Sequence, residues 1–341
     1  MIREAIAALV SGDSLDMEMA SAVMAEIMEG EVTPAQLGAF LTALRIKGET
    51  TDEIAGLAKV MRARAVPVMT DEPVIDVVGT GGDNANTFNI STAAALVAAG
   101  AGIKVAKHGN RAMSSRCGSA DVLEALGVRI DLTAEQVQRC LREVGMGFMF
   151  APSFHPAMKY AAAARREIGV RTVFNILGPL TNPARAEYQV IGVPDEALGE
   201  KIALALRQLD IKRALVVYGL NGIDEISITD SSRMWELGRE GIINNFYVAP
   251  EDFGFNRAPA HELGGGTPEE NATMLRRVLD GERTPRRDVV LMNAAAAMVV
   301  GGRVTSLQQG VALAGEIIDS GKARGKLEKL IAYSQSLGRE A

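Results

Sequence analysis

The sequence has 341 residues, of which 48% are hydrophobic and 4% aromatic, and its formal net charge is −6. A chain of this length and composition can bury a substantial core, in two domains or in one large domain with an appendage. The acidic balance and the lack of a polybasic run argue against a nucleic-acid groove, so we expect no nucleic-acid partner.

The cysteine and histidine counts limit the metal chemistry. Cys117 and Cys140 are the two cysteines, and there are three histidines, which is too few for a disulfide framework or a zinc site. Any bound metal is therefore expected to be a hard ion held by oxygen. The chain start lacks the apolar core of a signal peptide, and the longest apolar runs are shorter than a membrane span. We expect a cytoplasmic protein without a membrane partner.

Helical patterns occupy about the first 65 residues. Ser14 is predicted to cap one helix, residues 33–36 form a capping box with proline at the first helical position, and Thr50 opens a further helix. Apolar residues such as Leu37 and Phe40 follow at helical spacing. Four short amphipathic helices must bury these faces on one another, on the rest of the chain or on a second subunit.

From residue 74 the pattern alternates between strand and helix. Strands are predicted at 74–78, 103–106, 147–151, 188–193 and 214–218, with helices at 91–99, 119–126, 133–144 and 198–209 between them. Antiparallel strands are predicted at 234–237 and 245–248, and helices close the chain. The fold class is therefore α/β, with a mostly parallel central sheet flanked by helices and an all-helical N-terminal part.

Two glycine segments follow predicted strands about two dozen residues apart. Residues 79–83 read Gly-Thr-Gly-Gly-Asp, and residues 107–111 read Lys-His-Gly-Asn-Arg. Loops at the carboxyl ends of parallel strands bind ligands, and glycine lets backbone N–H groups approach an anion closely. A tight chain connection is the alternative, since neither segment is a P-loop. Hydroxyl-rich helix starts at 89–92 and 114–119 favour a phosphate site, to which Lys107 and Arg111 add positive charge.

Three further features could carry chemistry. Asp224 and Glu225 follow a predicted strand and turn, and their oxygens suit Mg²⁺ together with substrate phosphate, although a solvated acidic turn is the commoner structure. Arg165 ends an alanine-rich helix, where it can bind a carboxylate or remain exposed. His108 has no identifiable carboxylate partner, so a positioning or packing role is favoured over that of a general base.

Taken in order, these motifs resemble the anthranilate phosphoribosyltransferase family of tryptophan biosynthesis. The resemblance rests on residues 79–83, 89–92, 107–111, 118–124, 175–183 and 224–225, and it extends over nearly the whole chain. It implies a small helical domain, residues 1–70 joined by helices from about 156–185, and a larger α/β domain, residues 71–341. It also implies a homodimer formed through the helical domain, for which Leu37 and Phe40 are candidate interface residues.

The resemblance further implies the site. The phosphoribosyl diphosphate would be bound by Gly79, Gly82, Asp83, Thr87, Asn89, Ile90, Ser91, Thr92, Lys107, His108, Gly109, Asn110, Arg111, Ala112, Met113, Ser114, Ser115 and Ser119. Anthranilate would contact Gly79, Asn110 and Arg165, and two Mg²⁺ ions per subunit would be held by Ser91, Asp224 and Glu225.

The implied reaction agrees with the residue inventory. An aromatic amine is neutral and nucleophilic at pH 7, so its attack on the phosphoribosyl carbon needs no covalent nucleophile or strong acid–base residue, and none is predicted. Two alternatives remain. A pyrimidine nucleoside phosphorylase has a similar fold but a serine-glycine-arginine element where this chain has His108 to Arg111, and a nucleic-acid-binding relative would need a basic face.

Overall fold

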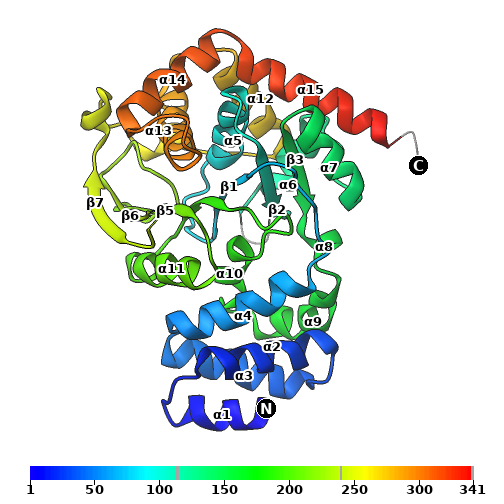
Figure 1. Ribbon diagram of the computed structural model, residues 1–341. Coiled ribbons are helices and arrows are strands. Elements are labelled where there is room, and N and C mark those ends of the chain that lie inside the picture. The colour runs from blue at the N-terminus through cyan, green and yellow to red at the C-terminus, as the bar shows by residue number, and fades with distance from the viewer. Residues whose placement is uncertain (113–114, 239, 339–341) are drawn as a thin grey trace.

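A computed structural model describes residues 1–112, 115–238 and 240–338. The chain begins with four helices that lie together at one end of the molecule (Figure 1): α1 (Ile2–Val10), α2 (Met17–Glu29), α3 (Pro34–Lys47) and α4 (Thr51–Arg64). The capping box predicted at the start of α3 and the helix start predicted at Thr50 are confirmed, because the Thr33 and Thr50 hydroxyls each accept a bond from the backbone N–H three residues on.

The predicted cap at Ser14 is wrong. Helix α2 begins at Met17, and Asp16 is its N-cap, with a side-chain oxygen that accepts a bond from Met19 N at 2.7 Å. Asp16 directly precedes the first helical residue and has an extended backbone, so its carboxylate reaches the free N–H groups of the first turn. Ser14 lies two residues too early for this geometry.

The helical bundle is completed by later segments of the chain. Helix α9 (Lys159–Ile168) packs on α2 and α3, and α10 (Phe174–Leu177) packs on α4. Leu37 and Phe40 are buried inside this bundle, with 2% and 0% exposure. The expectation that these two side chains lie at a subunit interface is therefore wrong, because the bundle itself covers that face of α3.

A seven-stranded sheet forms the centre of the larger part. Its order is β3-β2-β1-β4-β5-β6-β7, in which the first five strands are parallel and β6 and β7 are antiparallel. The strands are β1 (Ile75–Gly79), β2 (Val105–Gly109), β3 (Met146–Phe150), β4 (Tyr188–Gly192), β5 (Arg213–Gly219), β6 (Ser232–Leu237) and β7 (Ile243–Val248). All seven predicted strands are thus confirmed, with ends shifted by up to three residues.

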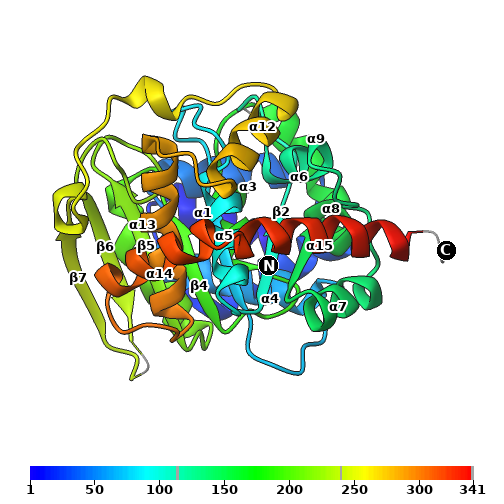
Figure 2. The ribbon, with the colours of Figure 1, turned by 90° about the horizontal axis from the view of Figure 1, so that it is seen from above.

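Helices cover both faces of this sheet. The remaining helices are α5 (Ile90–Gly100), α6 (Ser119–Ala125), α7 (Ala134–Glu143), α8 (Ala151–Phe154), α11 (Glu196–Gln208), α12 (Pro268–Leu279), α13 (Pro285–Val300), α14 (Leu307–Asp319) and α15 (Lys322–Leu337). Helices α5, α13, α14 and α15 pack together on one face, as the view from above shows (Figure 2). On the other face, α11 lies between β5 and helix α4 of the bundle (Figure 1). The predicted fold class is confirmed.

The strand order reverses between the neighbouring strands β1 and β4. Strands β2 and β3 extend the sheet on one side of β1, and β4 and β5 extend it on the other, with Gly79 paired to Gly192 at the carboxyl ends. Ligands of open α/β sheets bind at such switch points. A Cβ atom on either glycine would overlap Asp224: Gly79 makes room for its carboxylate, and Gly192 makes room for its backbone.

Candidate active site

A cavity of about 550 Å³ lies at the carboxyl ends of β1 and β2. The predicted residues that line it are Gly79, Gly82, Asp83, Thr87, Asn89, Ile90, Ser91, Thr92, Lys107, Gly109, Asn110, Arg111, Ala112, Ser115, Ser119, Arg165, Asp224 and Glu225. Met113 and Ser114 lie outside the described residues. His108 instead lines a second cavity. The fold therefore brings most of the predicted site to one place, from segments more than 100 residues apart.

The first glycine segment forms a loop directly after β1. Gly81 and Gly82 have φ angles of +71° and +75°, which are left-handed conformations that favour glycine. The N–H of Gly81 donates to Asp224 Oδ2 at 2.7 Å, which ties this loop to the loop after β5. The connection fixes the glycine loop against the acidic pair.

Three carboxylates, those of Asp83, Asp224 and Glu225, gather beside this loop. Burial, and next the charge of Asp83, raise the pKa of Asp224 to about 6. Burial and the charge of Asp224 raise the pKa of Glu225 well above its ordinary value, although Ser91 N donates to Glu225 Oε1 at 3.1 Å. Burial is the larger cause of both shifts, and repulsion between the neighbouring carboxylates adds to it, which a bound cation would relieve.

The donor set fits Mg²⁺ in a particular way. Among the described residues, no three His, Cys, Asp or Glu side chains converge to hold a metal ion by themselves. Mg²⁺ commonly binds through one or two carboxylates, with water and substrate phosphate as the other ligands. Asp224 and Glu225, with Asp83 nearby, match that arrangement, in which the phosphorylated substrate completes the coordination.

Lys107 lies within β2, contrary to the predicted loop position. Its side chain is 1% exposed, and Nζ donates to the carbonyl of Val77 at 2.6 Å. Burial lowers the pKa of Lys107, while Asp76 and Glu225 act in the opposite direction. Strand β2 continues through Lys107 because this carbonyl and these two carboxylates accommodate the ammonium group. The positive charge therefore lies beneath the cavity and close to the acidic cluster.

Arg111 is directed toward helix α6. Its guanidinium binds Glu124 at 2.7 and 3.1 Å and Asp121 at 3.0 Å. Asp121 also accepts bonds from the backbone N–H groups of Ala112 and Gly118, so it connects the two described ends of this loop. Much of the charge that Arg111 was expected to offer a phosphate is thus matched by carboxylates of the same loop and helix.

The second cavity has a volume of about 470 Å³ and adjoins the first. Both are lined by Gly79, Thr80, Asn110 and Arg165. Apolar side chains contribute much of the remaining wall: Met61, Pro152, Pro156, Met158, Phe174 and Pro179. Its charged lining residues are Lys159 and Arg165, both basic. The chemistry of this cavity suits an apolar ligand that carries a negative group.

Arg165 extends from helix α9 to the junction of the two cavities. Its guanidinium carbon lies 4.9 Å from the centre of the Phe174 ring, and burial lowers the pKa of its side chain. A guanidinium keeps its charge at neutral pH even when partly buried. Arg165 can therefore bind a carboxylate beside an aromatic surface.

Two imidazoles line the second cavity. The rings of His108 and His155 have centroids 5.1 Å apart, and they bond to the backbone of Gly178 and Thr181, respectively. Burial lowers the pKa of His108 to about 3 and that of His155 to about 4. Both rings are neutral at pH 7, and each is anchored to the same loop. This geometry agrees with a packing role for His108.

Sequence reasoning missed Arg171 as a cavity residue, together with its neighbour Thr172. Arg171 follows α9 by three residues, and its guanidinium donates to the carbonyls of Gly81 and Gly82. A backbone carbonyl has no sequence signature, so nothing in the printed sequence predicts this contact. The only available signal was the proximity of Arg171 to Arg165 along the chain.

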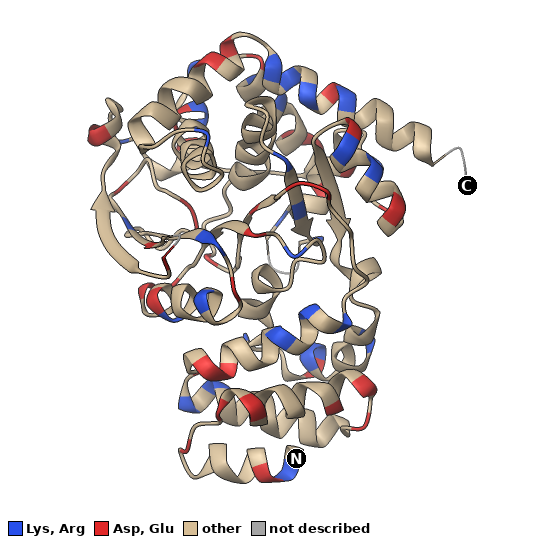
Figure 3. Ribbon diagram, viewed as in Figure 1, with Lys and Arg blue, Asp and Glu red and all other residues tan. Residues whose placement is uncertain are grey.

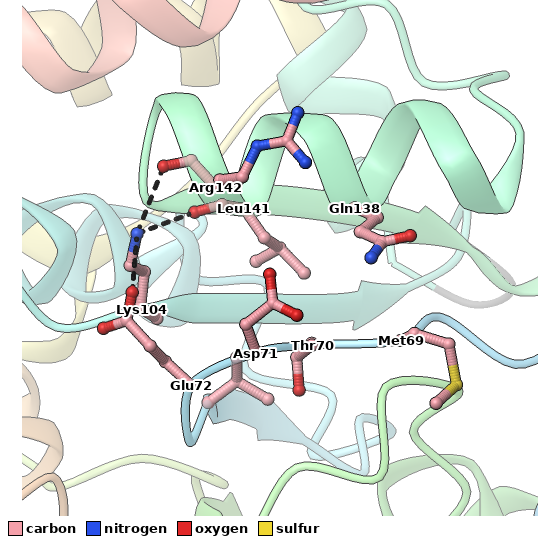
Figure 4. Close-up of a pocket in the computed structure, with 9 residues that line it drawn as sticks. Met69, Thr70, Asp71, Glu72, Lys104, Gln138, Leu141 and Arg142 are labelled. Atoms are coloured by element: carbon pink, nitrogen blue, oxygen red, sulfur yellow. Dashed lines mark hydrogen bonds and ion pairs between the residues drawn. The ribbon is translucent and has the colours of Figure 1, made fainter.

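A third pocket, of about 30 Å³, lies away from the glycine loop beside helix α7 (Figure 4). There Lys104 Nζ donates to the carbonyls of Leu141 and Arg142, both at 3.2 Å, and pairs with Glu72 at 3.5 Å. This volume holds about two water molecules. The lysine satisfies carbonyls near the end of α7, which explains its position without a ligand.

Charges over the rest of the molecule are mixed. In Figure 3, Lys and Arg residues are interspersed with Asp and Glu residues in both the helical bundle and the α/β part. The positive charge that faces an anionic ligand is therefore a local property of the two cavities.

Comparison with known proteins agrees with this architecture. Residues 3–65 match the family described as the helical bundle domain of a glycosyl transferase family, and residues 71–324 match the a/b domain of that family. The fold and these matches thus define a member of a glycosyl transferase family. The chain belongs to the anthranilate phosphoribosyltransferase family, as its relatives show.

Among these relatives, the anthranilate phosphoribosyltransferase of Dehalococcoides mccartyi is 61% identical over 338 residues, which cover 99% of each chain. The Chloroflexus aurantiacus enzyme is 60% identical and covers 98% of this chain and 99% of its own. The crystal structure of the Thermus thermophilus enzyme aligns with a TM-score of 0.92 and 46% identity, over 97% of this chain and 99% of that one. A Saccharomyces cerevisiae structure in complex with PRPP and Mg has a TM-score of 0.90 and 29% identity, with 98% of both chains covered.

Proposed function

We propose that this chain transfers the 5-phosphoribosyl group of 5-phosphoribosyl 1-diphosphate to the amine of anthranilate, which is a step of tryptophan biosynthesis. The observation that carries the proposal is the pair of adjoining cavities, one with a glycine loop and carboxylates and one apolar with Arg165 at the junction. Membership of the anthranilate phosphoribosyltransferase family supports the same substrates.

We place the donor substrate, 5-phosphoribosyl 1-diphosphate, in the larger cavity. In the proposal, the glycine loop and the start of α5 bind its phosphates through backbone N–H groups, helped by the positive end of the helix dipole. The other predicted donor residues that the structure describes line the walls of this cavity. His108 is the exception, since it lines the second cavity and can act only through its contact with the 178–181 loop.

Mg²⁺ is part of the proposal, held by Asp224, Glu225 and Ser91 as two ions per subunit. The crowded carboxylates support a cation site, and the yeast structure with PRPP and Mg supports the identity of the ion. When bound, the ion supplies positive charge that stabilises the departing diphosphate. The number of ions rests on the sequence resemblance alone.

Anthranilate belongs in the second cavity. We propose that Arg165 binds its carboxylate while Phe174 and the prolines pack on its ring, so that the amine faces the donor near Gly79 and Asn110. A yeast relative, 29% identical with a TM-score of 0.88, is described in complex with 4-fluoroanthranilate, which supports an aromatic acid as ligand.

The reaction then needs little from the protein beyond orientation and charge stabilisation. The amine nitrogen forms a bond to C1 of the ribose, the C1–O bond to diphosphate breaks, and one amine proton leaves. Holding both substrates in line can lower the barrier by up to ~7–11 kcal/mol. The neutral imidazoles beside the acceptor keep this cavity free of further charge, so Arg165 and Lys159 alone attract the carboxylate within the described lining.

Product identification tests the proposal. Purified protein with Mg²⁺, donor and anthranilate should release one diphosphate for each anthranilate consumed, whereas benzoate, which lacks the amine, should give no diphosphate above background. Phosphorolysis of thymidine or uridine would instead show a nucleoside phosphorylase. Salt-sensitive retardation of an oligonucleotide would show a nucleic-acid binder.

We further propose that the helical bundle is built from residues 1–70 and about 156–185 and that it forms the interface of a homodimer. We also propose a cytoplasmic location. Val10 on α1 and Ile46 on α3 are 72% and 80% exposed, and α1 packs on α3, so apolar side chains remain on the outer bundle surface. Its phosphorylated donor, which does not cross membranes, favours the cytoplasm. No helix in the described ranges is long and apolar enough to cross a membrane.

The subunit arrangement has a direct test. Ile46→Glu should convert a dimer into a monomer in sedimentation at micromolar concentration, and a wild-type monomer would contradict the proposed interface.

A further inference from the structure

Arg171 connects two parts of the site that belong to distant segments of the chain. Its guanidinium donates to the carbonyl of Gly81 at 2.8 Å and to that of Gly82. Both glycines lie about 90 residues earlier, in the loop that follows β1. Arg171 thereby binds two carbonyl groups of the glycine loop, residues 79–83, where we propose that the donor binds. We call this segment the donor loop.

The contact leaves no room for a side chain at Gly82. A Cβ atom there would overlap the guanidinium of Arg171, and the φ of +75° is itself unfavourable for other residues. Gly82 is therefore required by Arg171 as well as by the turn. On the opposite side, Gly81 N donates to Asp224, so the loop is held from two directions.

The direction of these bonds determines where the loop amides face. The C=O and N–H of a planar trans peptide point in opposite directions. Because the carbonyls of Gly81 and Gly82 point to Arg171, the N–H groups of the same two peptides, which belong to Gly82 and Asp83, point away from it. Two consecutive donors thus face one way, as binding of an anion requires.

Arg171 also lies on the segment that carries the acceptor residue. Arg165 is in the last turn of α9, Gly169 ends this helix in a left-handed conformation, and Arg171 follows two residues later. A connection of only six residues thus joins Arg165 to the arginine that binds the glycine loop.

We propose that Arg171 is a positioning residue: it orients the Gly82 and Asp83 amides toward the donor diphosphate and couples donor binding to acceptor binding through the Arg165 segment. The inference rests on the proposed function. Because coupling between two binding sites is reciprocal, bound donor should tighten binding of the acceptor, and bound acceptor should tighten binding of the donor by the same factor.

Steady-state kinetics and calorimetry test this inference. Arg171→Ala should raise the KM and the Kd for 5-phosphoribosyl 1-diphosphate at least tenfold and should reduce the donor–acceptor coupling factor to about one. Arg171→Lys keeps the charge but loses the planar fork, so its effect should be intermediate. The matched control is Arg303→Ala, an exposed arginine beyond the end of α13, which should behave as wild type.

Two further measurements separate positioning from general stability. Added guanidinium at millimolar concentration should restore part of the donor affinity of Arg171→Ala, because it can refill the vacated site. Gly82→Ala displaces the same guanidinium, so its effect on donor KM should be smaller in the Arg171→Ala background, where only the strain of the left-handed φ remains, than in wild type. If Arg171→Ala does not fold, Arg171→Lys and Gly82→Ala still give the donor Kd and the donor–acceptor coupling factor.

Unchanged donor Kd and unchanged coupling in a folded Arg171→Lys or Arg171→Ala protein would overturn the inference. An effect on thermal stability alone, without guanidinium rescue, would also overturn it. A wild-type protein that binds the donor but transfers nothing to anthranilate would contradict the proposed function instead. The calorimetric comparison of donor binding would then still decide the role of Arg171.

Discussion

Asn182 Nδ2 donates to Asp76 Oδ2 at 2.7 Å, deep between the sheet and the loop that lines the second cavity. The same nitrogen donates to the carbonyl of Ala106 at 2.8 Å, and His108 N donates to the other oxygen of Asp76 at 3.3 Å. One side chain thus fastens the 175–183 loop to β1 and β2. This buried polar network fixes one wall of the second cavity.

Asn182→Ala should therefore lower the free energy of unfolding by roughly 2–3 kcal/mol, because it leaves a buried carboxylate and a carbonyl without their donor. Urea denaturation measures this change. The exposed Asn244→Ala on β7 is the control and should stay within about 0.5 kcal/mol of wild type. Equal effects of the two substitutions would contradict the structural role of Asn182.

Acid should destabilise the protein through its buried imidazoles. The pKa of His155 falls from 6.5 to about 4 on folding, so the unfolded chain binds more protons between these values and stability decreases as the pH falls through this window. The shift corresponds to a loss of roughly 3 kcal/mol by pH 4. His108, with a pKa of about 3, acts in the same direction.

Urea denaturation at several pH values between 7 and 4 checks this effect. His155→Asn keeps a side-chain donor for the Thr181 carbonyl but does not titrate, so it should reduce the pH dependence to the part that His108 causes. The exposed His261→Asn should leave the wild-type slope unchanged. A slope as steep as that of wild type after the loss of His155 would show that other groups cause the acid sensitivity.

Arg165→Ala should separate the two substrates. Loss of a charge-assisted hydrogen bond costs about 1.5–3 kcal/mol, which corresponds to a rise of roughly 10- to 150-fold in the KM for anthranilate. The KM for the donor should change much less. Initial rates with each substrate varied in turn measure both constants, and equal changes in the two would argue against a carboxylate-binding role.

The acidic pair should govern the metal dependence. Asp224→Asn combined with Glu225→Gln should leave a folded protein in which turnover collapses and donor binding weakens, because the carboxylate ligands of the proposed Mg²⁺ site are removed. Circular dichroism verifies the fold, and a Mg²⁺ titration of the rate measures the effect. Wild-type dependence on Mg²⁺ in the double variant would place the ion elsewhere.

Local patterns predicted the elements of the fold well. All seven strands were predicted because their β-branched and aromatic runs are bounded by turn residues, and the helix starts predicted at Thr33 and Thr50 match the caps in the structure. The two errors concern the N-cap residue of α2 and the surface that covers Leu37. Ser14 and Asp16 are both good caps, and only the start of α2 decides between them. The burial of Leu37 depends on helix α9, which is distant in sequence.

The site was predictable where motifs mark it and unpredictable where packing creates it. The glycine loop and Asp224 follow recognisable strand ends, so their meeting at the switch point could be inferred. The burial of Lys107 could not be inferred from the sequence, because it depends on a carbonyl of the neighbouring strand. Arg171 donates to backbone carbonyls, and Arg111 forms ion pairs with the helix that follows its loop. No sequence pattern predicts either contact.

The most direct test of the central claim is the fluorescence of anthranilate in a mixture of the protein, 5-phosphoribosyl 1-diphosphate and Mg²⁺. We predict that the signal decays as the amine is alkylated, that EDTA stops the decay, and that Arg165→Ala slows it at low anthranilate. A constant signal with folded wild-type protein, from micromolar to millimolar substrate, would contradict the account even if every contact described above is correct.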